Sequence, residues 1–191
     1  MKRRILLAVF TVFFLSVIFT GCFSSESEEE SGSKNVTTQN DADIVALGIR
    51  TQLLNAAPHY ATGTTTWNDT VEHGSVSGTA TISGSFTKTS SGYPDYVTTY
   101  KYNNVSIILN NFCDDDFYPA LTGSALIYGT AMVDSSYSGN VYSGYWYITG
   151  SAEMSGAYTG TMSFNLYIYK TGSDHSGTIV VEGKSWSVSD M

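Results

Sequence analysis

The sequence predicts a mainly β fold: an antiparallel meander of seven or eight strands, curled into a barrel or curved sheet, with one N-terminal helix packed on it. Composition is the first observation, because 14% of the residues are aromatic, 14 Tyr among them, and only 14% are charged. Aromatic and β-branched residues favour strands. The second is a two-residue alternation of apolar and polar positions after residue 61, and the third is a recurring glycine motif.

The alternation is clearest in two stretches. Residues 162–169 place Met162, Phe164, Leu166 and Ile168 on one face and polar residues and Tyr on the other. Residues 105–109 place Val105, Ile107 and Leu109 on one face in the same way. One apolar face and one wetter face is typical of an antiparallel sheet rather than a doubly buried parallel one.

The repeated motif has two glycines six positions apart, and it occupies residues 77–84, 122–129, 149–156 and 176–183. The last three copies start 27 residues apart, which fits one hairpin each. Glycine weakens a strand interior, so its repeated use indicates bulges or bends where the sheet curls. The alternative interpretation is a shallow surface where a ligand approaches the backbone.

The predicted helix spans residues 41–57 and opens the single β-rich domain, residues 41–191. Asp41 and Asp43 stand at its electropositive start, and Pro58 stops it. Val45, Ile49, Leu53 and Ala56 form an apolar stripe, widened by Leu47, Leu54 and Ala57. Such a helix needs cover on several sides, so we expect it to pack on the sheet.

Residues 1–21 have the anatomy of a secretory signal peptide, with a basic start and an apolar run of about 16 residues. The run ends in Phe19-Thr20-Gly21-Cys22, which resembles the lipobox of bacterial lipoproteins. The resemblance implies that Cys22 carries acyl chains, palmitate among them, and anchors the mature chain to a membrane. The alternatives are secretion without lipid and an uncleaved helix, although a spanning helix needs roughly 20 residues.

Residues 22–40 are rich in Ser, Glu and Asn, and we expect a disordered acidic tether after the lipidated cysteine. Phe23 and Ser24 follow Cys22, and by resemblance to lipoprotein sorting the lack of Asp there favours the outer membrane, where the organism has one. Three of the nine basic residues lie in the signal, which leaves six against 17 acidic residues. Such a chain repels nucleic acid, so no nucleic-acid partner is expected.

Catalytic chemistry is not legible in the sequence. Cys113 lacks a second cysteine for a disulfide once Cys22 is lipidated, and its acidic neighbours disfavour a thiolate. Those neighbours, Asp114, Asp115 and Asp116, are a weak calcium candidate, since they lack the spacing of a calcium loop. Asp174 and His175 sit in a turn, where adjacent residues cannot form a hydrolytic triad. We therefore expect no enzyme, no cofactor and no metal site.

The distinctive residues are tyrosines, whose large ring and water-tolerant hydroxyl suit a contact surface. The candidate ligand-contact residues are Tyr96, Tyr100, Tyr102, Tyr145, Tyr147, Tyr167 and Tyr169. The bland alternative is that Tyr simply favours half-buried strand positions. The sequence therefore predicts an envelope lipoprotein with a non-catalytic structural or interaction domain. The alternative is a binding module that holds an apolar small molecule inside the sheet, or contacts a glycan or protein through its tyrosines.

Overall fold

A computed structural model of the chain describes residues 33–92, 96–135 and 139–190. The predicted signal peptide and Cys22 lie outside the described residues. In chain order the elements are β1 (Lys34–Asn35), α1 (Gln39–Ala56), β2 (Gly63–His73), β3 (Ser77–Ser90), β4 (Val97–Cys113), β5 (Ala120–Asp134), β6 (Val141–Ser155), β7 (Tyr158–Tyr169), the short 3₁₀ helix η1 (Lys170–Gly172), β8 (Asp174–Val181) and β9 (Lys184–Ser189). Within the described ranges, no helix is long and apolar enough to cross a membrane.

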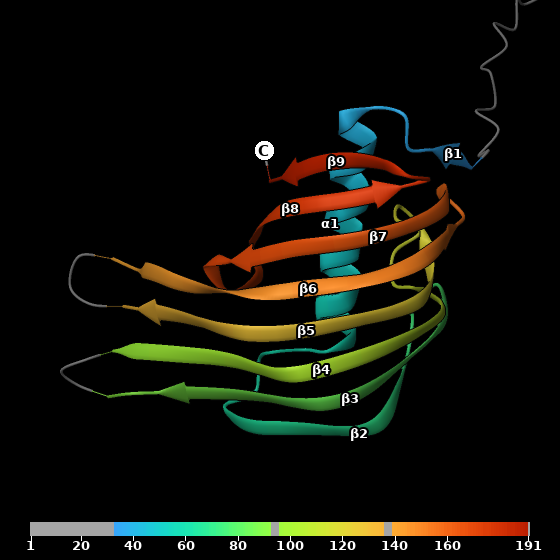
Figure 1. Cartoon of the computed structure of the whole chain (residues 1–191). Helices are drawn as coiled ribbons and strands as arrows, with labels where there is room; N and C mark the ends of the chain where they lie inside the picture. Colours follow the sequence, from blue (N-terminus) through green and yellow to red (C-terminus); the bar gives the residue numbers. More distant parts are fainter. Residues whose placement is uncertain (1–32, 93–95, 136–138, 191) are drawn as a thin grey trace, which may run out of the picture. The chain divides into compact units, whose positions relative to one another are not determined.

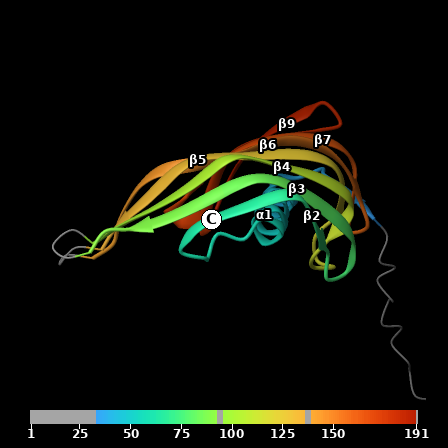
Figure 2. The same cartoon turned by 90° about the horizontal axis from the view of Figure 1, so that it is seen from below.

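Strands β2 to β9 form one antiparallel meander, in which each strand pairs with its neighbours in the chain (Figure 1). This confirms the predicted topology. Strands β2 and β9 are the two ends of the sheet, which is curved rather than closed (Figure 2). The short β1 pairs parallel to the start of β7, with Lys34 opposite Tyr158.

Two glycines of the repeated motif show why glycine is required where the sheet bends. Gly78 has φ +68° and Gly84 has φ +128°, and the register between β3 and β4 shifts at both positions. A Cβ on Gly84 would lie 2.8 Å from the Cα of Val105, too close for any side chain. Glycine adopts such backbone angles without a steric cost, so the bends are built into the sequence.

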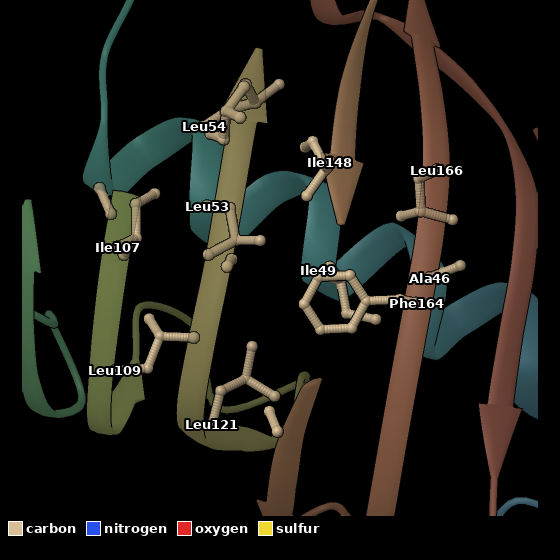
Figure 3. Packing of buried hydrophobic residues seen from close by; sticks show 14 of the residues in the cluster. Ala46, Ile49, Leu53, Leu54, Ile107, Leu109, Leu121, Ile148, Phe164 and Leu166 are labelled. Atoms are coloured by element: carbon tan, nitrogen blue, oxygen red, sulfur yellow. The ribbon is translucent and has the colours of Figure 1, made fainter. Parts of the chain in front are cut away.

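The core lies between α1 and the concave face of the sheet (Figures 2 and 3). Ile49 and Leu53 of α1 are fully buried, as are Ile107 of β4 and Ile148 of β6. Burying a side chain of this size contributes about 1.5–3 kcal/mol. On β7, the four apolar residues of the predicted alternation, Met162 to Ile168, are all buried. The predicted apolar face is therefore the one that receives the helix.

The helix begins at Gln39, two residues before the predicted start, because Thr38 and Asp41 form a capping box. The backbone N–H of Asp41 donates to Thr38 Oγ1 at 3.2 Å, and that of Thr38 donates to Asp41 Oδ2 at 3.0 Å. Val36 is also buried. Residues 34–40, which were expected to belong to a disordered tether, instead form β1, the helix cap and the first residues of α1. The rest of the expected tether, residues 22–32, lies outside the described residues.

Polar contacts hold the C-terminal part of α1 against the sheet and the β4–β5 loop. Gln52, which is fully buried, donates from Nε2 to the carbonyl of Pro119 at 3.0 Å and accepts from the backbone N–H of Asp114 at 3.3 Å. The hydroxyl of Tyr102 donates to the carbonyl of Ala57 at 2.8 Å. Buried polar groups need such partners, so these bonds fix the position of the helix on the sheet and add to its stability.

Replacing Ile49 with Ala is expected to lower the free energy of unfolding by about 2–5 kcal/mol, because it leaves a cavity under the helix. The matched control is Ile108→Ala, at a position 58% exposed on the outer face, with an expected loss of about 1 kcal/mol or less. Urea denaturation measures both. Equal losses at the two positions would contradict the assignment of the core to the helix side.

A candidate binding groove on the outer face

Four tyrosines meet on the outer face of the sheet, where β5, β6 and β7 run side by side. Tyr147 stands between two partners: it stacks on Tyr128 with ring centroids 5.0 Å apart and the planes 10° from parallel, and it meets Tyr167 edge to face at 5.2 Å. Tyr145 contacts the rings of both Tyr147 and Tyr167, at 6.2 and 6.4 Å. The structure thus brings three of the predicted tyrosines together.

The register explains this cluster. Tyr128 is directly opposite Tyr147, and Tyr147 is directly opposite Tyr167. Directly opposed aromatic pairs contribute roughly 0.2–1 kcal/mol each to a sheet. Tyr128 is missing from the sequence-based set because its role depends on that register, which residue spacing within one strand does not reveal.

A groove of about 970 Å³ lies beside the cluster. Its lining residues are Tyr142, Ser143, Gly144, Tyr145, Tyr167, Tyr169, Lys170 and Ser176. Tyr142, Tyr145 and Tyr167 remain 38–51% exposed. The volume is that of a typical ligand site, and the lining combines aromatic rings with hydroxyl groups.

Lys170 is the ionisable cation of this lining, and it forms an ion pair with Asp174 four residues later. The carboxylate of Asp174 raises the pKa of Lys170 above its ordinary value. The ammonium therefore stays charged and is held near the mouth of the groove, with further N–H groups left to donate.

Tyr169 lines the groove together with Tyr145 and Tyr167, whereas Tyr147 does not. The remaining three predicted tyrosines belong to neither the cluster nor the groove. Tyr102 is 1% exposed and faces the core, where burial raises its pKa. Tyr100 lies half-buried on the same concave side, with its ring 6.3 Å from that of Trp146. Tyr96 is 46% exposed, but it precedes β4 and does not line the groove. Tyr100 and Tyr102 thus share one face of β4, and that face is the apolar one.

The acidic run after β4 is used by backbone amides. Asp114 Oδ1 accepts from the backbone N–H of Ser75 at 3.1 Å, and Asp115 Oδ1 accepts from that of Phe117 at 3.0 Å. Across the described residues, no group of three or more His, Cys, Asp or Glu side chains converges as a metal site. Cys113 is free and buried, and burial raises the pKa of its thiol.

A second polar cluster joins α1 to the last two strands. Asp190 accepts from Arg50 Nη1 at 3.0 Å, and its Oδ1 lies 2.7 Å from Nδ1 of the buried His175. Arg50 also donates to the carbonyl of Ser173 at 2.5 Å. Sequence reasoning missed this cluster because Arg50 and Asp190 are 140 residues apart.

No protein-family model, curated protein sequence or solved structure matches the chain.

Stability is expected to fall as the pH drops from about 7.5 to 5.5. Burial lowers the pKa of His175, Asp190 opposes that shift, and Arg50 adds to it, while burial also lowers the pKa of His59. The unfolded chain therefore binds more protons below about pH 6.5, so the stability present above this pH is lost as the pH falls toward the lowered pKa values. Melting temperatures measured across this range test the direction.

His175→Asn should flatten this pH dependence, because its amide takes the place of Nδ1 beside Asp190 without titrating. The control is His73→Gln, at an exposed position. An unchanged slope for His175→Asn would show that His175 does not carry the effect.

Proposed function

We propose that the chain is a lipid-anchored, non-catalytic binding module of the bacterial cell envelope, which recognises its ligand in the tyrosine-lined groove. The observation that carries the proposal is the groove itself, about 970 Å³ between Tyr142, Tyr145 and Tyr167. Exposed rings that contact one another, as Tyr145 and Tyr167 do, form a continuous patch, and such patches are uncommon on a surface with no partner. Tyr rings are also enriched where proteins bind, because they bring large contact area at low entropy cost.

The packing of α1 favours this groove over the interior of the sheet as a ligand site. Ala46, Ile49 and Leu53 of the helix fill the concave side and are all fully buried (Figure 3). An apolar small molecule inside the curve would have to displace those side chains. A ligand on the outer face displaces only water.

The position of the groove along the strands suits display from an anchor. Lys34, near the start of the described chain, pairs with Tyr158 at the first residue of β7, whereas Tyr167 and Tyr169 are at the other end of the same strand (Figure 1). Nine residues of strand separate Tyr158 from Tyr167, which is about 30 Å. Within the described residues, the groove and the segment at Lys34 that follows the proposed tether therefore lie at opposite ends of β7.

The anchor part of the proposal is tested by Cys22→Ser, which removes the thiol that would be acylated. The protein is expected to move from the membrane fraction to the soluble fraction, because stable attachment rests on buried acyl chains. Cys113→Ser is the matched control, since that cysteine is buried in the domain and should leave the protein membrane-bound. A Cys22→Ser protein that stays with the membrane would contradict the lipid anchor.

The groove is tested by placing a photo-crosslinking phenylalanine derivative at position 145 of the full-length protein in cells. Discrete adducts are expected on gels after irradiation, because the ring at this position faces the groove. Position 60 is the control, because Tyr60 is the more exposed of the two, at 69%, and lies outside the groove. The same weak, diffuse pattern at both positions would count against the groove as a binding site.

A further inference from the structure

The groove lies next to β6, at the point where the neighbouring strand β7 ends. Strand β6 pairs with β5 along its whole length, from Val141 to Ser155. Its pairing with β7 begins only at Trp146, opposite Ile168. Within the described part of the chain, the five residues Val141–Tyr145 therefore pair with a strand on one side only, and the last four of them line the groove.

The backbone itself turns away at this point. Lys170, Thr171 and Gly172 have φ values of +48°, +55° and +102°, so three successive residues lie in the left-handed region. The turn leads toward the core side, where a Cβ on Gly172 would lie 3.3 Å from Leu54 and from Trp146. Left-handed residues other than glycine carry a steric cost, so the departure of the chain from β6 is a defined feature of the fold.

The two end strands of the sheet are protected against the addition of another strand, whereas Val141–Tyr145 of β6 are not. The edge strand β2 has a register shift between Trp67 and Thr70 and carries Asp69 at φ +51°. Strand β9 has the carbonyl of Ser187 occupied by Gln39 Nε2 at 2.7 Å. Bulges, charges and cover are the devices that stop strands from adding to an edge. Val141–Tyr145 contains neither a charged residue nor proline, and its pairing with β5 has no register shift. Its one irregular backbone angle is at Gly144, which has φ +72°.

We infer that the groove binds an extended polypeptide segment, which adds to β6 as a short strand in line with β7. This inference rests on the proposed function and names its ligand class. In an antiparallel ladder alternate residues direct N–H and C=O to the same side, so the open stretch offers about four main-chain hydrogen bonds. Side chains on one face of the added segment would lie over Tyr145 and Tyr167.

The chemistry of the lining indicates the composition of that segment. Tyr145 on the outer face favours a β-branched or aromatic residue opposite it. Apart from Lys170, whose charge is paired with that of Asp174, the lining is uncharged. The segment is therefore an uncharged one rich in β-branched and aromatic residues. A second copy of this chain is a poor occupant, because two copies that each carry six basic against 17 acidic residues after the signal repel each other.

The test uses the full-length lipoprotein in phospholipid nanodiscs and a phage-displayed library of random dodecapeptides, with an array of bacterial glycans in parallel. We expect selected peptides to share an uncharged, β-branched or aromatic pattern with a period of two. Their affinity should fall at least tenfold for Tyr145→Ala and for Tyr167→Ala, and stay unchanged for Tyr60→Ala. Circular dichroism spectra confirm that each variant folds.

A scan of N-methyl groups along one selected peptide then separates strand addition from ring contact alone. Methylating every second backbone nitrogen in one of the two alternate sets should cost at least tenfold in affinity, while the other set has little effect. Equal sensitivity of both sets, or of neither, would overturn strand addition.

Three further outcomes distinguish this inference from the proposed function. Glycan binding that is lost in Tyr145→Ala and Tyr167→Ala, with no peptide selected, would overturn the polypeptide and keep the groove as a binding site. A dimer seen by light scattering and abolished by Tyr145→Ala would overturn it in favour of a second copy. Binding of neither library nor array, together with no crosslink at position 145, would overturn both proposals.

Discussion

An open, curved sheet must cover its apolar face, and in this protein the helix α1 covers it. Strands β2 to β9 present Ile107, Ile148 and Leu166 on the concave side, and α1 places Ile49 and Leu53 against them. Without the helix, this face would be exposed to water along several strands at once. The glycine bends that curve the sheet serve the same requirement, because a flat sheet would touch a helix along a much narrower line.

This division of labour between the two faces accounts for the location of the candidate site. The concave side is committed to packing, so the hydroxyl-rich outer side is the one free to vary and to bind. Polar contacts hold the helix on the concave face. Gln52 binds the loop after β4 and Arg50 binds Asp190 after β9, so α1 is fixed at separate points of the sheet. A helix held in this way leaves the ends of β6 and β7 in a constant relation, which a preformed groove requires.

The fold could be predicted from the sequence to a considerable degree, because its signals are local. Residues 162–169 alternate with a period of two, and the helical stripe of residues 41–57 matches the helix within two residues at its start. The site was predicted only in part, since it depends on relations between strands. Nothing in the spacing of Tyr100 and Tyr102 says that their face is the buried one. The stacking of Tyr128 on Tyr147 and the early end of β7 beside β6 follow from register, which one sequence does not specify.

The meander topology has a consequence for how the molecule is made. Each hairpin needs only its neighbour, so the sheet can grow strand by strand as the chain is synthesised. The helix that covers this sheet is made before it, yet its partner Asp190 follows β9, the last strand of the meander. The apolar stripe of α1 therefore stays without full cover until β9 has been made, and chains interrupted before β9 would present it to other chains. The first element of the core to be synthesised, α1, is thus the last to be fully buried.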